Sequence, residues 1–150
     1  MPLSPLPSIE LISRADEEAS AKIPELKQFV SAGIPIPGSD QMMDGYTDIH
    51  KMLIENPVAT YFMRLQGNSL AHLGFHDKDI LIVDRVHSFA DGETKFVVAA
   101  VKGDLCLKKV HKQSNKLFLL HPYDKMEPFK LKPKHRFEIW GFVIYNIHKV

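Results

Sequence analysis

The sequence predicts a mostly β protein with one short helix and an extended N-terminal arm. Strand-like runs rich in β-branched and aromatic residues dominate the second half of the chain. Turn residues separate these runs, as in a protein built from short strands. At 150 residues the chain is one domain of ordinary size, with room for one hydrophobic core.

The first thirty residues contain little regular pattern. Residues 1–8 carry three prolines and are expected to form an extended tail. Ser13–Ala19 has helix-forming composition, but Pro24 interrupts the pattern and the apolar face that follows is short. This stretch is too small to be a helix-turn-helix domain.

One short helix is predicted over Asp48–Asn56, with Asp48 as its N-cap and Pro57 marking its end. The remaining elements are expected to be strands. Ile80–Val83 is continuously apolar, which indicates a strand buried on both faces, and it follows the turn Asp77–Asp79. The β-rich run Thr60–Leu70 ends in a Gly-x-Ser turn. The other predicted strands are Phe96–Val101 and Leu105–Val110 as a hairpin, Leu117–Leu120, and Phe137–Ile147.

The composition excludes several classes of protein. Hydrophobic residues at 45%, charged residues at 25% and a net charge of +1 are typical of a soluble globular protein, so direct DNA binding is not expected. The eight histidines and the single cysteine, Cys106, show no metal-binding spacing, and we predict neither a metal nor another cofactor. The lone cysteine, the lack of a signal peptide and the lack of a membrane-spanning run predict a cytoplasmic location.

A serine and two lysines are the candidate catalytic residues. Ser69 follows a strand and stands two residues after Gly67, so a tight turn can present its hydroxyl beside free backbone N–H groups. Such a sequence is also common at ordinary turns. Lys108 and Lys109 lie in an apolar strand downstream, where burial can convert a lysine into a base. Strand alternation puts the two lysines on opposite faces and does not choose between them.

These motifs, in this order, resemble the LexA/UmuD family of self-cleaving serine-lysine peptidases, and the resemblance runs from about Val30 to the C-terminus. The shared segments are Ala59–Phe62, Gly67–Leu70, Asp79–Asp84, Ala99–Val101 and Leu107–Lys109.

The resemblance implies a LexA/signal-peptidase-like peptidase fold of twisted antiparallel sheets. It also implies that Ser69 is the nucleophile and that Lys108 is the general base. The oxyanion donors would be the backbone N–H of Ser69 and a second one at Asn68.

The resemblance further places a self-cleavage site at Ala32-Gly33. Small residues on both sides of the bond let an extended chain enter a cleft closely. Residues 1–32 would then be an arm that is removed, and residues 33–150 the serine-lysine peptidase-like β domain. From its glycine and proline residues alone, the same stretch is equally typical of a Gly/Pro linker.

The chain departs from the family pattern near the nucleophile. Asn68 and Leu70 replace the usual neighbours of the serine, and the loop Gly92–Phe96 is slightly longer. Lys78 replaces the glycine of an Asp-Gly-Asp turn, at a cost of up to about 1 kcal/mol if that position requires a left-handed backbone.

The resemblance implies a homodimeric SOS-response protein that cleaves itself when stimulated by a RecA nucleoprotein filament. The shortened form would act as accessory subunit of an error-prone, UmuC-like translesion DNA polymerase. The alternatives are a non-enzymatic partner-binding module that retains the fold and a peptidase that acts on other proteins. A histidine base at His72 or His76 is a further alternative, although neither has an evident ordered partner in the sequence.

Overall fold

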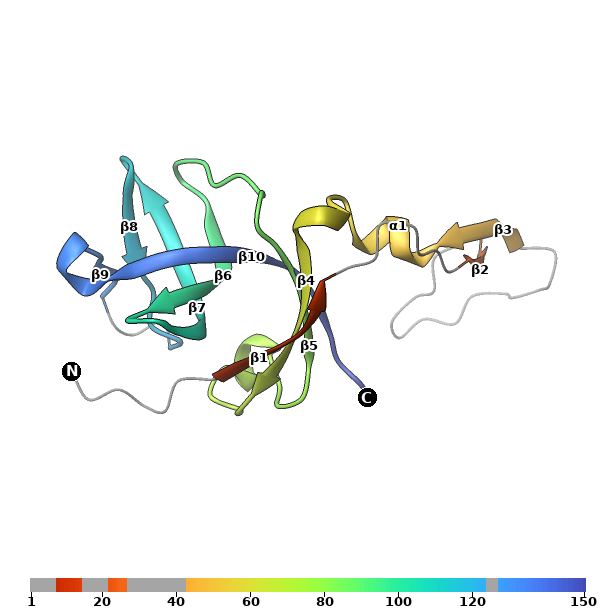
Figure 1. The fold of residues 1–150 in the computed structure, drawn as a ribbon, viewed down its shortest axis with the longest axis horizontal. Helices are drawn as coiled ribbons and strands as arrows, with labels where there is room; N and C mark the ends of the chain where they lie inside the picture. Colours follow the sequence, from red (N-terminus) through yellow and green to blue (C-terminus); the bar gives the residue numbers. More distant parts are fainter. Residues whose placement is uncertain (1–7, 15–21, 27–42, 124–126) are drawn as a thin grey trace, which may run out of the picture.

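The computed structural model describes residues 8–14, 22–26, 43–123 and 127–150 (Figure 1). Among these residues, eight strands form one antiparallel sheet in the order β1-β4-β5-β10-β6-β7-β8-β9, and β2 and β3 form a separate two-stranded ribbon. This architecture, with little helix, confirms the predicted mostly β fold.

The strands are β1 (Ser8–Arg14), β2 (Lys22–Leu26), β3 (Met43–Asp48), β4 (Thr60–Gln66), β5 (Ile80–Asp84), β6 (Thr94–Val101), β7 (Asp104–Gln113), β8 (Lys116–Leu119), β9 (Phe129–Lys130) and β10 (Phe137–Ile147). The helices are α1 (Ile49–Leu53) and the short 3-10 turns η2 (Pro57–Ala59), η3 (Ala71–Leu73) and η4 (Pro133–His135).

The main sheet closes on itself through β1. This strand pairs with β4 along its length, and its first residue, Ser8, also pairs with Cys106 of β7. The strands β1, β4, β5, β10, β6 and β7 therefore form a closed ring of pairings, while β8 and β9 extend the sheet beyond β7. The closure removes the exposed edges that β4 and β7 would otherwise present at this point.

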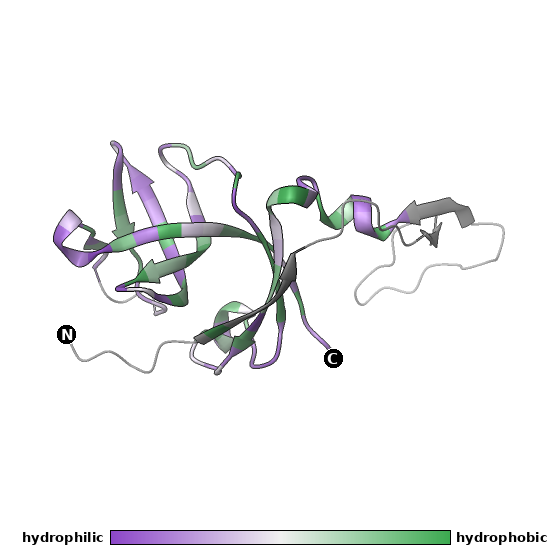
Figure 2. Ribbon diagram, in the orientation of Figure 1, coloured by the Kyte–Doolittle hydropathy of each residue, from purple (hydrophilic) through white to green (hydrophobic). Residues whose placement is uncertain are grey.

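The core is divided between the two faces of β6 and β7. Val98 and Leu107 pack in one cluster, and their neighbours Val97 and Cys106 pack in another. Successive residues of a strand point to opposite faces, so the two clusters lie on opposite sides of the sheet. Figure 2 shows hydrophobic residues recurring along β4, β5 and β10, whereas η4 is hydrophilic.

Two strands at the centre of the sheet explain much of its stability. Leu81, Ile82 and Val83 of β5 are completely buried, which confirms the prediction of a strand covered on both faces. On the neighbouring strand, a Cβ added to Gly141 would lie 2.6 Å from Val83 Cγ1. Glycine at position 141 therefore permits β10 to approach β5 closely.

Local sequence signals predicted two features correctly. The Asp48 carboxylate accepts hydrogen bonds from the N–H groups of His50 (3.1 Å) and Lys51 (3.3 Å), as expected of an N-cap. The helix ends at Leu53, earlier than predicted.

The predicted β6–β7 hairpin is also present. It turns at Lys102 and Gly103, whose φ angles of 52° and 89° are both left-handed. Two consecutive left-handed residues match the twist of antiparallel strands in a two-residue turn.

The N-terminal stretch differs from the expectation. Ser8–Arg14 forms strand β1, so Ser13 and Arg14 belong to a strand despite their helix-forming context. Pairing with β4 overrides local propensity here. Pro24 lies inside β2, where the ribbon has no further strand and the missing N–H is tolerated. The tail before Ser8 and the rest of Ser13–Ala19 lie outside the described residues.

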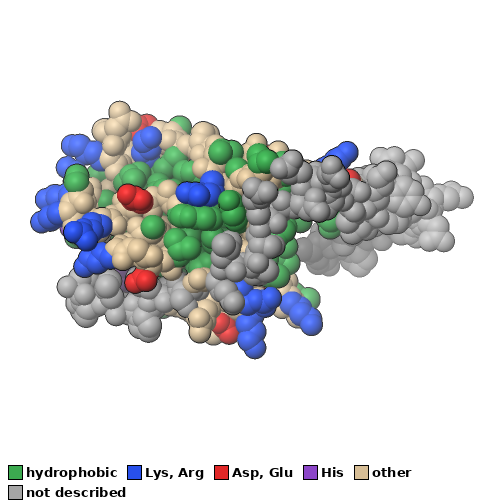
Figure 3. All heavy atoms as spheres, in the orientation of Figure 1, with side chains coloured by type: hydrophobic (Ala, Val, Ile, Leu, Met, Phe, Trp, Pro, Cys, Tyr) green, Lys and Arg blue, Asp and Glu red, His purple; other side chains and the backbone are tan. Residues whose placement is uncertain are grey.

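Charged side chains are unevenly distributed over the surface. Figure 3 shows lysine and arginine side chains gathered at the end of the molecule that carries β8 and β9. Lys116, Lys130 and Lys132 are exposed there, and hydrogen bonding to Lys116 lowers the pKa of Lys130. The net charge of +1 therefore conceals a local basic area.

Candidate functional site

Ser69 lies in the turn between β4 and η3. Gly67 begins this turn with a φ of 100°, a left-handed conformation that glycine adopts without steric cost. The Asn68 carbonyl accepts a hydrogen bond from the Ala71 N–H at 3.1 Å, which folds the chain back over Ser69. The Gly-x-Ser spacing is thus needed for the backbone geometry of the turn.

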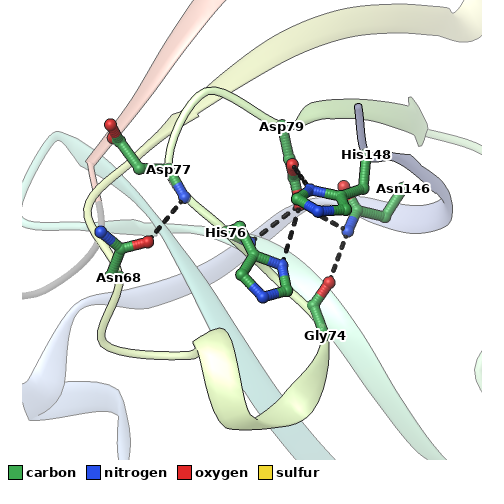
Figure 4. A network of polar contacts seen from close by, with 7 residues as sticks. All are labelled: Asn68, Gly74, His76, Asp77, Asp79, Asn146 and His148. Atoms are coloured by element: carbon green, nitrogen blue, oxygen red, sulfur yellow. Dashed lines mark hydrogen bonds and ion pairs between the residues drawn. The ribbon is translucent and has the colours of Figure 1, made fainter. Parts of the chain in front are cut away.

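Asp77 forms two hydrogen bonds with this turn. Its Oδ1 accepts a hydrogen bond of 2.7 Å from the Gly67 N–H. Its own N–H donates to Asn68 Oδ1 at 3.0 Å (Figure 4). The two bonds connect the turn that carries Ser69 to the turn that precedes β5. We call these two turns, residues 67–70 and 76–79, the nucleophile turn and the support turn.

The Ser69 hydroxyl is buried but unpaired. The residue is half-buried, and its Oγ makes no hydrogen bond within the described part of the chain. Nor does any hydrogen bond among the described residues use the backbone N–H of Asn68 or Ser69. A buried hydroxyl without a hydrogen-bond partner costs about 1–3 kcal/mol of stability. The turn thus offers a ligand this hydroxyl and two N–H donors that no other described group uses.

Lys108 lies in β7 opposite Val97 of β6. The residue is half-buried, and burial lowers the pKa of its ammonium group, while nearby Cys106 opposes part of this shift. Among the described residues, no carboxylate forms an ion pair with Lys108 to restore the charge. A half-buried lysine without a counter-ion has the environment that a neutral amine base requires.

Lys109 has a different environment. Its Nζ lies 5.9 Å from the centre of the Phe96 ring, and that ring packs against Phe75 with centroids 4.6 Å apart. A cation is attracted to the electron-rich face of an aromatic ring. Lys109 thus lies against the aromatic pair Phe75 and Phe96, whereas burial lowers the pKa of Lys108.

Two bridges connect the nucleophile turn to β7. Ser8 of β1 pairs with both Gln66, three residues before Ser69, and Cys106, two residues before Lys108. Leu70, which follows Ser69, also packs in the cluster that contains Leu107, whose side chain lies on the face of β7 opposite to that of Lys108. The structure therefore brings the two segments into one region.

The segment after β8 forms the second bridge. The Leu120 N–H donates to the Lys109 carbonyl at 2.9 Å, and the Pro122 carbonyl accepts from His72 Nε2 at 2.7 Å. The His72 ring also stacks on Tyr123, with centroids 4.5 Å apart. Residues 120–123 thus connect β7, which carries both lysines, to η3, which begins two residues after Ser69.

The two histidines near Ser69 are both engaged elsewhere. Because a carbonyl oxygen can only accept a hydrogen bond, His72 Nε2 is protonated and donates a hydrogen bond to the Pro122 carbonyl. His76 belongs to a cluster with Asp79 and His148 in the support turn and after β10 (Figure 4). His72 thus has a carbonyl partner and no carboxylate, whereas His76 Nδ1 lies 3.8 Å from Asp79 Oδ2. Among the described residues neither histidine forms a hydrogen bond with Ser69 Oγ, which is the contact that a histidine base requires.

Asp79 holds the support turn against the C-terminal strand. Burial opposes its ionisation, but hydrogen bonds from the His76 N–H (2.8 Å), His148 Nδ1 (2.6 Å) and Asn146 Nδ2 (2.9 Å) outweigh burial and lower its pKa. Sequence reasoning placed Asp79 only in a turn and did not identify Asn146 or His148. The local sequence contains no signal for contacts that span 146 − 79 = 67 residues and more.

Lys78 has the left-handed backbone on which the expected cost depends. Its φ is 70°, so the residue that replaces the family's glycine adopts a left-handed backbone. Its N–H nevertheless donates to the Leu65 carbonyl at 2.8 Å, and the Leu65 N–H donates to the Asp79 carbonyl at 2.9 Å. These bonds keep the support turn in place in spite of the strain.

The predicted scissile pair, Ala32 and Gly33, lies outside the described residues. The helices that the structure describes include none long and apolar enough to span a membrane.

Comparison with known proteins finds one family whose model matches the chain and several relatives of similar sequence. Residues 24–144 match the model of the family described as peptidase S24-like. Protein MucA of Salmonella typhimurium is 30% identical over 131 residues, which cover 83% of this chain and 84% of MucA. Protein SamA of Salmonella typhimurium strain LT2 is 28% identical over 141 residues, covering 93% of this chain and 94% of SamA. The LexA repressor of Glaesserella parasuis is 29% identical over 116 residues, which are 77% of this chain and 54% of the repressor.

Proposed function

Because this chain belongs to the peptidase S24-like family, we propose that it is a self-cleaving serine peptidase with Ser69 as nucleophile and Lys108 as general base. The observation that carries the proposal is the pair of environments described above. Ser69 offers a buried, unpaired hydroxyl, and Lys108 has a pKa lowered by burial. Both belong to segments that β1 and residues 120–123 connect.

The reaction begins with proton transfer. The neutral amine of Lys108 accepts the hydroxyl proton of Ser69, and Oγ attacks the carbonyl carbon of Ala32. The N–H groups of Ser69 and Asn68 stabilise the negative charge that develops on the carbonyl oxygen. Collapse of the tetrahedral intermediate breaks the bond to Gly33, whose nitrogen takes the proton from the Lys108 ammonium.

The second half of the reaction releases the arm. Water attacks the ester that links Ala32 to Ser69, and Lys108 accepts a proton from that water. The ester bond breaks, and the proton returns to Ser69 Oγ. The products are residues 1–32 with a new carboxylate and residues 33–150 with a new amino group.

Cleavage takes place within one chain or between two copies, according to which Ser69 the arm reaches. β2 runs antiparallel to β3, with Lys22 opposite Asp48 beside α1 and Leu26 opposite Met43 at the other end of the ribbon. Ala32 is only six positions after Leu26, a reach of about 20 Å at full extension. The site of a second copy and the site of the same chain are both candidates, and mixing variants distinguishes them.

Gly33→Glu is the variant for this purpose, because it adds a side chain and an unpaired charge at the bond but leaves Ser69 unchanged. A Gly33→Glu protein that processes a Ser69→Ala partner demonstrates cleavage between copies. A Gly33→Glu protein that is inert towards itself and towards the partner leaves the placement of the bond at Ala32-Gly33 without support.

The biological role follows from the same family resemblance. We infer that a RecA nucleoprotein filament stimulates the cleavage in the SOS response and that residues 33–150 serve a UmuC-like translesion polymerase as a homodimeric accessory subunit. The exposed side chains of Tyr145 (43%) and Ile147 (44%) on β10 support a protein interface on that strand. In this role the protein acts in the cytoplasm.

One observation favours a second candidate function. Ser69 Oγ makes no hydrogen bond with Lys108, so the described structure contains no assembled serine-lysine pair. A non-enzymatic module that binds a polymerase or another partner needs no such pair.

Mass analysis after incubation at raised pH separates the two functions. Self-cleavage predicts fragments of 32 and 150 − 32 = 118 residues, which Ser69→Ala abolishes. A chain that stays intact with and without a RecA filament contradicts the peptidase and supports the module.

A further inference from the structure

A compact group of three potential metal ligands lies beneath the support turn. His76 and Asp79 belong to that turn, and His148 follows β10 (Figure 4). One ligand atom from each residue lies within 4.8 Å of the other two. The sequence prediction of no metal considered only local spacing, and these residues are separated by up to 148 − 76 = 72 positions.

The Asp79 carboxylate forms the fixed part of this group. Its side chain is 2% exposed, and its oxygens accept from the His76 N–H, Asn146 Nδ2 and His148 Nδ1. Asn146 Nδ2 also donates to the Gly74 carbonyl at 2.8 Å, which fixes the amide in turn. The backbone and Asn146 therefore hold the carboxylate in one orientation.

The two imidazoles form the adjustable part. The side chains of His76 and His148 are each 41% exposed, and their ring centroids are 4.3 Å apart. His76 Nδ1 lies 3.8 Å from Asp79 Oδ2, and His148 Nδ1 lies 2.6 Å from Asp79 Oδ1. An ion can thus approach from solvent, and small rotations of either ring change these distances.

Two buried atoms of the group lack a partner among the described residues, namely His76 Nδ1 and Asn146 Oδ1. Buried polar atoms are almost always satisfied in folded proteins. The unprotonated nitrogen of a neutral imidazole and the oxygen of an amide each carry a lone pair that can bind a cation. A cation bound between the rings would satisfy the first atom, and the amide oxygen offers a further ligand.

We propose that His76, Asp79 and His148 bind a divalent transition-metal ion of the Zn²⁺ type. Two imidazole nitrogens and one carboxylate oxygen suit Zn²⁺, whereas Mg²⁺ and Ca²⁺ prefer oxygen ligands. Zinc bonds of about 2.0–2.2 Å hold neighbouring ligand atoms about 3.3 Å apart in a tetrahedral site. The distances of 2.6 Å from His148 Nδ1 and 3.8 Å from His76 Nδ1 run to different oxygens of Asp79, and they lie on either side of this value. Binding therefore requires rotations of the rings that bring both nitrogens to this spacing from the one oxygen that holds the ion.

Metal binding would join two distant parts of the chain. The ion replaces the proton between His148 and Asp79 and ties the end of β10 to the support turn. That turn holds Gly67 and Asn68 through Asp77. The ion is therefore a structural one that stabilises the nucleophile turn from a distance, and the inference does not depend on the proposed peptidase activity.

The test uses the full chain carrying Ser69→Ala, freed of metal with EDTA. Calorimetric titration with ZnCl₂ is expected to show one ion bound per chain with micromolar or tighter affinity. His76→Gln and His148→Gln should each weaken binding by about tenfold or more. His111→Gln is the matched control, because His111 is outside the group and bonds to Thr94.

Two further readouts keep the test independent of folding defects. At a free Zn²⁺ concentration 100 times the Kd, the folding equilibrium constant should rise about 100-fold, and EDTA should reverse the rise. Co²⁺ in place of Zn²⁺ should give the strong visible absorption of a tetrahedral nitrogen–oxygen site. Absence of saturable binding to the parent chain overturns the proposal, as does unchanged affinity in both the His76→Gln and His148→Gln variants.

Discussion

Removal of the Asp77 carboxylate tests how the nucleophile turn is held. Asp77→Ala deletes the 2.7 Å hydrogen bond from the Gly67 N–H but keeps the backbone N–H that donates to Asn68. Hydrogen bonds to charged groups contribute about 1.5–3 kcal/mol, and neutral ones about 0.5–1.5 kcal/mol. We therefore expect Asp77→Ala to lower the free energy of unfolding by about 1.5–3 kcal/mol, and Asn68→Ala by about half as much.

The measurement is urea unfolding in a Ser69→Ala background, which prevents self-cleavage during the experiment. In a domain of this size, each kcal/mol corresponds to about 2–4 °C in Tm. Asp91→Ala is the matched control, because Asp91 Oδ1 accepts one backbone hydrogen bond of 3.1 Å, from Asn115, in an exposed turn. Because this bond is exposed to solvent, whereas the Asp77 bond is partly buried, the control should lose less than about 1 kcal/mol.

The same variants with Ser69 restored test the consequence for catalysis. A turn that has lost its support positions the hydroxyl poorly, so Asp77→Ala should cleave itself at least about tenfold more slowly under conditions where it is folded. Asp91→Ala should retain the parent rate. Destabilisation of Asp77→Ala with an unchanged rate would refute the role of Asp77 in positioning Ser69.

Three further perturbations follow from the structure. Lys78→Gly relieves a left-handed φ of 70° and should raise the free energy of unfolding by up to about 1 kcal/mol; a Tm below that of the parent would contradict this. Gly141→Ala puts a Cβ 2.6 Å from Val83 Cγ1 and should cost about 1–3 kcal/mol in urea unfolding, and an unchanged midpoint would show that β10 has room there. Lys108→Met should be more stable than its parent at neutral pH by about 1.4 kcal/mol for each unit of the lowered pKa. The unfolded chain binds more protons between that lowered pKa and about 10.4, so the parent's stability rises with pH in this window and the difference should disappear above it. Parallel pH curves for the two proteins would argue against a lowered pKa at Lys108.

The sequence predicted those elements whose cause is local. The N-cap at Asp48 and the turn at Lys102–Gly103 depend on a few neighbouring residues, and both were expected. For Lys78 the family pattern, which has glycine there, raised the question of a left-handed backbone but did not decide it, and the φ of 70° does. Alternation along β7 gave the opposite faces of Lys108 and Lys109 but not their environments.

Long-range pairing could not be derived in this way. Ser8–Arg14 becomes a strand because β4 and β7 provide partners at least 61 − 14 = 47 positions away. The contact of Asp77 with Gly67 likewise depends on how two turns meet in space. The group around Asp79 draws residues from the turn before β5 and from the end of β10, and no local pattern indicates it.

The rate of self-cleavage as a function of pH, without any activator, tests the central claim most directly. If a neutral Lys108 is the base, the rate should climb about tenfold per pH unit and level off at a pKa below the ordinary value of about 10.4. Lys108→Arg should be inactive at every accessible pH, because arginine remains protonated. A rate that levels off near pH 6.5, or cleavage that survives in Lys108→Arg, would contradict the account and indicate a histidine or another base.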